Sequence, residues 1–82
     1  HRGQEVDLLI RRGNLLVPVE IKSAETFSVA FVSAIRAYRA ELGSTLSEGY
    51  VVYGGTDSFV LEGTRALPAG SGLTTGLGLD PR

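Results

Sequence analysis

Three charged residues in the first third of the chain have the types and spacing that phosphodiester chemistry requires. Asp7 lies within the mostly apolar residues 5–10, and Glu20 and Lys22 close a second apolar stretch, residues 15–22. Carboxylate oxygens suit a hard cation such as Mg²⁺, which polarises a phosphate and lowers the pKa of a bound water. A nearby ammonium group can position that water and offset charge that develops on the phosphate. The three residues therefore point to metal-dependent phosphodiester cleavage.

The two apolar stretches are expected to form a β-hairpin. Val, Ile and Leu dominate residues 6–12 and 15–22, and Gly13-Asn14 between them suits a two-residue turn. Pro18 has no N–H to donate, so we expect that the next strand stops short of it or that a bulge lies there. A two-residue turn fixes which residues face each other across the hairpin.

This register gathers the charges on one face. Asp7 lies opposite Glu20, with Cβ atoms about 4.5–5.5 Å apart, and Lys22 projects from the same face. Two carboxylates this close repel each other unless a cation lies between them. With the backbone carbonyl of Ile21 as a further donor, the predicted metal ligands are Asp7, Glu20 and Ile21. The other face is wholly apolar and is expected to be the core face: Val6, Leu8, Ile10, Leu15, Val17, Val19 and Ile21.

Residues 27–42 are expected to form a helix, because apolar side chains recur at spacings of three and four. Thr26 or Ser28 can cap its start, and Gly43 can end it. The apolar stripe consists of Phe27, Phe31, Ala34, Ile35, Tyr38 and Leu42.

The remaining pattern predicts extended segments and completes the fold class. Residues 50–53 predict a strand that a crossover through the helix places parallel to residues 15–22. Residues 59–61 and 64–67 are weaker candidates on either side of Glu62-Gly63. The predicted fold is α/β, a mixed sheet in which an antiparallel hairpin is joined by a parallel strand through one crossover helix.

The bulk composition fits one small globular domain without a basic footprint for nucleic acid. The chain has 82 residues, 43% of them hydrophobic, and a formal net charge of −1. It has no cysteine, no apolar run that could span a membrane and no signal-peptide pattern, so we expect a cytoplasmic protein with no membrane partner. Arg36 and Arg39 would be a phosphate-contacting pair if the helix met DNA, but a solvated face is the simpler interpretation. Residues 69–82 are rich in glycine and predict a flexible tail after a domain at 1–68.

The order of the segments resembles the PD-(D/E)XK nuclease-like superfamily. Asp7, a hairpin, Glu20-Ile21-Lys22, a helix and a strand follow one another as in that superfamily. The resemblance is closer to one branch, a domain of unknown function found at the C-terminus of many bacterial and archaeal AAA-type ATPases. The segments that carry this closer resemblance are residues 5–10, 17–23 and 49–55 and the closing Leu67-Pro68.

The resemblance implies a truncated restriction-endonuclease-like core with a metal site on Asp7, Glu20 and Lys22. The superfamily often adds an acidic residue from a preceding helix, and we expect that this contribution is either missing or lies upstream of His1. The chain has no Gly-rich phosphate loop, so ATP would bind to a preceding part. The implied function is Mg²⁺-dependent cleavage of DNA by the C-terminal domain of an ATPase. The alternative is a catalytically inactive module that docks its own ATPase domain or forms a homodimer, which the near-neutral charge favours.

Overall fold

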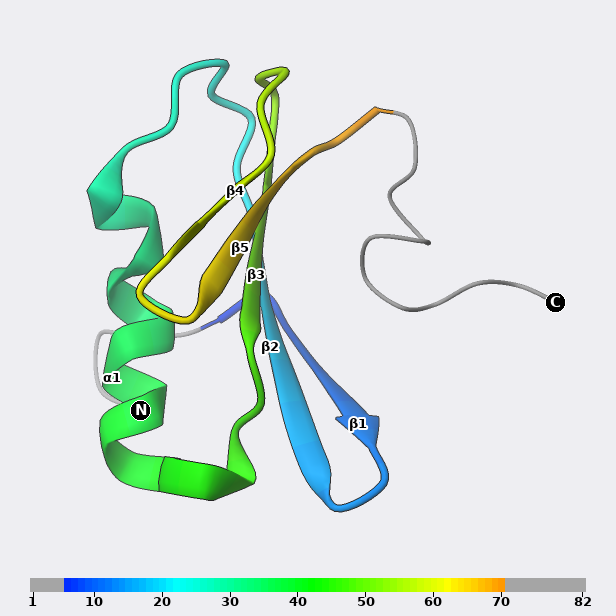
Figure 1. Ribbon diagram of the computed structural model, residues 1–82, viewed down its shortest axis with the longest axis vertical. Helices are drawn as coiled ribbons and strands as arrows, with labels where there is room; N and C mark the ends of the chain where they lie inside the picture. Colours follow the sequence, from blue (N-terminus) through cyan, green and yellow to red (C-terminus); the bar gives the residue numbers. More distant parts are fainter. Residues whose placement is uncertain (1–5, 71–82) are drawn as a thin grey trace, which may run out of the picture.

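The computed structural model describes residues 6–70, which form a five-stranded mixed sheet with one α-helix on one face (Figure 1). The strands are β1 (Leu8–Arg12), β2 (Leu15–Ile21), β3 (Gly49–Tyr53), β4 (Phe59–Leu61) and β5 (Thr64–Pro68). The helix is α1 (Ser33–Leu42), flanked by the 3₁₀ turns η1 (Val29–Val32) and η2 (Gly43–Thr45). The strand order is β1-β2-β3-β5-β4. The predicted small α/β fold with a mixed sheet is confirmed.

The hairpin of β1 and β2 has the predicted register. Ile10 pairs with Val17, and Gly13 adopts a φ of +62° in the turn, a conformation that glycine enters without steric cost. Strand β1 begins at Leu8, two residues later than predicted, so Asp7 precedes the strand instead of lying within it.

Strands β2 and β3 are parallel neighbours, as the crossover predicted. Their paired residues begin at Val19 and Tyr50, one residue beyond Pro18. The missing N–H of Pro18 is therefore accommodated because the parallel ladder starts after it. The backbone N–H of Lys22 donates to the carbonyl of Val52 at 2.8 Å, which continues the contact past the end of β2.

Helix α1 is shorter than predicted because the chain first forms the 3₁₀ turn η1. The side chain of Ser28, and not that of Thr26, caps this turn by accepting a hydrogen bond from Ala30 N at 3.2 Å. Gly43 ends the helix with a φ of +56°, as predicted. No helix within residues 6–70 is long and apolar enough to cross a membrane.

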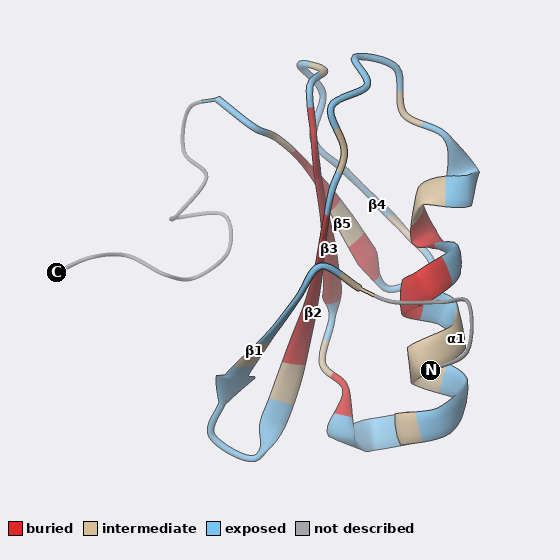
Figure 2. Cartoon of the chain, turned by 180° about the vertical axis from the view of Figure 1, so that it is seen from behind, coloured by how far each residue is buried: buried red, intermediate tan, exposed pale blue. Residues whose placement is uncertain are grey.

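Helix α1 packs on the face of the sheet that carries Glu20 and Lys22, and not on the wholly apolar face. Figure 2 shows burial concentrated in β3 and its neighbours, while the edge strand β1 is largely exposed. The expectation of a core face along the whole hairpin was therefore wrong, since Leu8, Leu15 and Ile21 are exposed. The cluster under the helix consists of Val32, Ile35, Val51, Tyr53 and Ala66, and the cluster on the opposite face of Val17, Val19, Tyr50, Val52 and Leu67.

The two weaker extended segments form the antiparallel hairpin of β4 and β5. Glu62 and Gly63 connect them with φ values of 52° and 74°, the positive pair that a tight hairpin turn requires. Strand β5 also lies parallel to β3, so this hairpin extends the sheet on the side away from β1.

Both arginines of helix α1 make polar contacts within the domain. Arg36 is exposed and forms an ion pair with Glu62. Arg39 is partly buried and donates to the carbonyls of Leu46 at 3.0 Å and Ser47 at 2.8 Å, so its predicted solvated position was wrong. The predicted tail at 69–82 lies outside the described residues from position 71 onward.

Two glycines hold the loop after β3 against the loop after β2. Gly54 N donates to Ala24 O at 2.8 Å. A Cβ on Gly55 would lie 2.6 Å from Glu25 O and against the ring of Tyr53. Because neither neighbour leaves room for a methyl group, the approach of the two loops requires glycine there.

Gly55→Ala is expected to lower the free energy of unfolding by about 1–3 kcal/mol, because the loops must separate to admit the methyl group. Urea denaturation followed by circular dichroism measures the change. Gly70→Ala is the matched control, since nothing lies within 4 Å of its added Cβ. Equal effects of the two substitutions would contradict the close packing.

Candidate functional site

Asp7 lies beside β2 because its carboxylate takes the place of a backbone acceptor. Its Oδ2 accepts a hydrogen bond from the backbone N–H of Ile21 at 2.8 Å. The paired residues of β1 end at Leu8, so this N–H would otherwise lack a partner from β1. This hydrogen bond places Asp7 next to Glu20. The predicted hairpin register also made them neighbours, but as a regular pair of strand residues.

Glu20 is a buried carboxyl group under the helix. Its side chain is 4% exposed, and its neighbour in the parallel ladder, Val51, is fully buried. Burial above all, and then the hydrogen bond and negative charge of Asp7, raise the pKa of Glu20 to about 7. The hydrogen bond from Ile21 N–H is the main reason that the pKa of Asp7 is lowered. Below pH 7 the protonated Glu20 therefore donates to an ionised Asp7, and the pair carries one negative charge.

Lys22 continues the same face but does not pair with the two acids. Its Nζ lies 5.6 Å from the centroid of the Phe31 ring, within the range of a cation–π contact. Among residues 6–70 it forms no ion pair. Its charge still lowers the pKa of both carboxyl groups.

The donor set suits a hard cation that is held together with a phosphate. Within the described residues no group of three or more His, Cys, Asp or Glu side chains could hold a metal, so Asp7 and Glu20 would be the side-chain ligands. Mg²⁺ commonly binds through one or two carboxylates plus substrate phosphate and keeps several waters. Glu20 would have to lose its proton before it could coordinate a cation, so cation binding here would release a proton.

A cluster of aromatic rings beside Lys22 was not predicted as part of the site. The Phe27 ring meets those of Phe31, Tyr53 and Phe59 edge to face, with centroids 5.4, 5.6 and 4.8 Å away. The sequence placed Phe27 and Phe31 on the helix stripe by their spacing, which suggested core packing. The contacts of Phe27 with Tyr53 and Phe59 depend on two loops, and the spacing carries no information about them.

The shared proton predicts that the protein becomes less stable as the pH rises toward neutrality. Folded Glu20 keeps its proton to about pH 7, whereas in the unfolded chain it loses it near the ordinary value of 4.5. The folded state therefore binds more protons in this range, and the free energy of unfolding falls with rising pH by at most about 1.4 kcal/mol per unit. Glu20→Gln keeps a donor to Asp7 and should flatten this slope.

Urea denaturation at a series of pH values between about 5 and about 8 measures the slope for both proteins. Asp7 acts in the opposite direction, because its lowered pKa adds stability that is lost only in stronger acid. Between about pH 5 and about pH 8 the difference in slope therefore reports the titration of Glu20 and not that of Asp7. Equal slopes below pH 7 in the wild type and in Glu20→Gln would contradict the shared proton.

The comparisons with known proteins support the resemblance to a domain of unknown function, and not the finer resemblance to nucleases. Residues 1–71 match the family described as "Domain of unknown function (DUF4143)". No curated protein and no solved structure matches the chain. Since the family match covers most of the 82 residues, the chain belongs to the DUF4143 family of domains of unknown function.

Proposed function

We propose that this domain cleaves phosphodiester bonds of DNA in a metal-dependent reaction. The observation that carries the proposal is the buried carboxyl group of Glu20, which shares a proton with Asp7 on the face that also presents Lys22. Burying an ionisable group costs stability, and strongly shifted pKa values concentrate at functional sites. The order of segments that resembles the PD-(D/E)XK superfamily supports a restriction-endonuclease-like core. By the same resemblance the domain would form the C-terminal part of an AAA-type ATPase.

Each residue has a separate role in this proposal. Asp7 and Glu20 would hold the cation, with the carbonyl of Ile21 as a third oxygen. When bound, Mg²⁺ would supply polarisation of the phosphate and a more acidic water. The hydrogen bond from Ile21 N–H keeps Asp7 in place before any ligand arrives. Lys22 would offset the negative charge that builds on the phosphate, because no carboxylate of residues 6–70 holds its ammonium group.

Nicking of supercoiled plasmid with Mg²⁺ or Mn²⁺ tests the proposal. Glu20→Gln should lower the rate at least about 100-fold, because the amide replaces a metal ligand at unchanged size. Lys22→Gln should have a similar effect, because the phosphate loses its cationic neighbour.

Arg11→Gln is the control for Lys22→Gln. It removes the same charge from an exposed side chain whose described hydrogen bond is a 3.5 Å contact with Gly13 O. Activity should stay within about twofold of wild type, since such surface charges contribute little. No cleavage by the wild-type protein, or equal cleavage by all four proteins, would overturn the nuclease assignment.

An inactive interaction module is the second candidate, and the exposed edge of the sheet favours it. The edge strand β1 and the start of β2 leave large apolar side chains 40–48% exposed: Leu8, Leu9 and Leu15. An exposed apolar edge strand can pair with the edge of another chain. The near-neutral net charge of −1 also fits a protein partner better than nucleic acid.

On this second candidate the protein is expected to form a homodimer through β1. Sedimentation equilibrium should then show a mass that rises with concentration, and Leu8→Lys should keep the protein monomeric because a charge blunts the edge. A titration with Mn²⁺ in the millimolar range separates the two candidates. Dimerisation without metal binding favours the module, whereas metal binding that Glu20→Gln abolishes favours the nuclease.

A further inference from the structure

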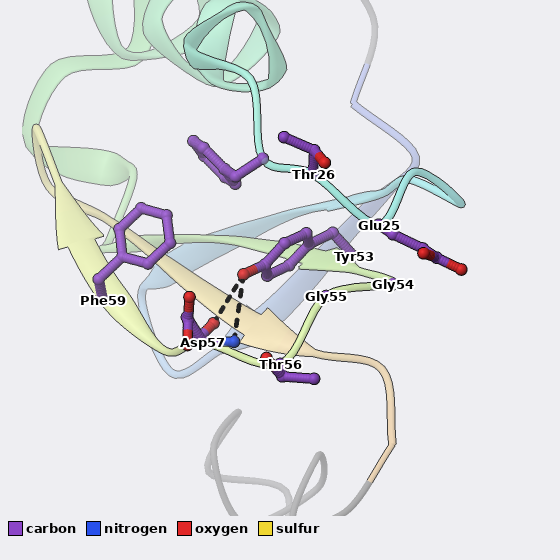
Figure 3. Close-up of a pocket in the computed structure, with 9 residues that line it drawn as sticks. Glu25, Thr26, Tyr53, Gly54, Gly55, Thr56, Asp57 and Phe59 are labelled. Atoms are coloured by element: carbon purple, nitrogen blue, oxygen red, sulfur yellow. Dashed lines mark hydrogen bonds between the residues drawn. The ribbon is translucent and has the colours of Figure 1, made fainter.

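A cavity of about 420 Å³ lies between the loop after β2 and the loop after β3 (Figure 3). Both loops follow the carboxyl ends of parallel strands, the edge at which open α/β sheets bind ligands. The volume is within the range of small-molecule sites, about 300–1,000 Å³. The described residues that line it include Glu25, Phe27, Tyr53, Asp57 and Phe59. The three candidate catalytic residues are not among them, so the cavity is a separate site.

Aromatic rings form one end of the cavity. Phe59 is 36% exposed, and its ring centroid lies 4.8 Å from that of Phe27. The two rings meet edge to face at an interplanar angle of 80°. The ring that presents its edge therefore keeps its faces uncovered by the other ring. In the same ring cluster, Phe31 already holds the Lys22 ammonium group at 5.6 Å. These rings therefore have the character of a surface that attracts cations.

The charge of the lining also selects a cation. Its charged side chains are the carboxylates of Glu25 and Asp57, and no lysine or arginine lies among the described lining residues. Neither carboxylate forms an ion pair within residues 6–70. A phosphate or other anion would be repelled, whereas a positively charged group would be attracted.

Asp57 is held in place without the use of its side chain. The Tyr53 hydroxyl donates to the backbone carbonyl of Asp57 at 3.0 Å and lies 3.3 Å from its N–H, which donates back. Figure 3 shows the Asp57 side chain between Tyr53 and Phe59, whereas Glu25 lies at the other end of the cavity. The backbone that carries the Asp57 carboxylate is therefore fixed near the exposed Phe59 ring before any ligand binds.

We propose that this cavity binds a guanidinium group, stacked on Phe59 and paired with the carboxylate of Asp57. Guanidinium is planar, is always charged, stacks on aromatic faces and pairs with carboxylates through two parallel N–H donors. An ammonium group offers the charge without the flat surface, so it fits less well. The site stands apart from the proposed nuclease function, because it does not use Asp7, Glu20 or Lys22.

Titration of the ¹⁵N-labelled chain, followed by amide chemical shifts, tests the proposal with three probes. N-acetyl-arginine amide and free L-arginine carry the guanidinium group as part of a polypeptide and as a small molecule, and N-acetyl-lysine amide carries an ammonium. The arginine probes should shift the amides of residues 53–59 with a Kd of about 1 mM, at least about fivefold tighter than the lysine probe. Tighter binding of the blocked form assigns the ligand to a protein partner, and tighter binding of the free form to a metabolite.

Three variants and a control locate the site. Asp57→Asn should weaken arginine binding about fivefold and Phe59→Leu about threefold, while Glu25→Gln, at the far end, should weaken it less. Glu62→Gln removes the same charge from the turn between β4 and β5 and should leave the Kd unchanged. Absence of shifts at about 10 mM arginine, equal binding of the lysine probe, or unchanged binding by Asp57→Asn would each overturn the proposal.

Discussion

A carboxyl group that is buried beneath a helix must give up its charge or find a partner, and this constraint shapes the whole hairpin end. Glu20 meets it by keeping its proton and donating a hydrogen bond to Asp7. Asp7 can remain ionised because the backbone N–H of Ile21 donates to it. The pKa values of the two neighbouring acids thus move in opposite directions, that of Asp7 downward through the Ile21 N–H and that of Glu20 upward mainly through burial. Acid and base roles are separated in this way in many enzyme sites.

The aromatic cluster gives the two candidate sites a common support. Phe31 holds the ammonium group of Lys22, so the two carboxylates need not neutralise it. Phe27 touches Phe31 on one side and Tyr53 and Phe59 on the other. The rings therefore form a continuous series of contacts from Lys22 to the wall of the cavity. A displacement of Phe27 would therefore change the packing at both candidate sites.

The parts of the fold that were predicted from the sequence are those set by local chemistry. Gly13-Asn14 allows one hairpin register, and Gly43 ends the helix because it can adopt positive φ. The face that the helix covers was not predictable from the hairpin, because both faces carry apolar residues near their centre and the charges occupy only one end. The displaced start of β1 was also missed, since a side chain, Asp7, performs the work of a backbone carbonyl there. The cavity escaped prediction because it is built by loops that only the tertiary structure brings together.

Strand β3 joins two hairpins that are each local in sequence. The pairs β1–β2 and β4–β5 close through tight turns, whereas β3 pairs in parallel with β2 and with β5. Hairpins form within about 1–10 μs, while bringing a distant strand between them carries a larger loop-closure entropy. In the unfolded chain Glu20 loses its proton near the ordinary value of 4.5, whereas the folded domain keeps it to about pH 7. Between these two pH values the chain takes up a proton from the solvent as it folds, so folding is there also an acid–base reaction.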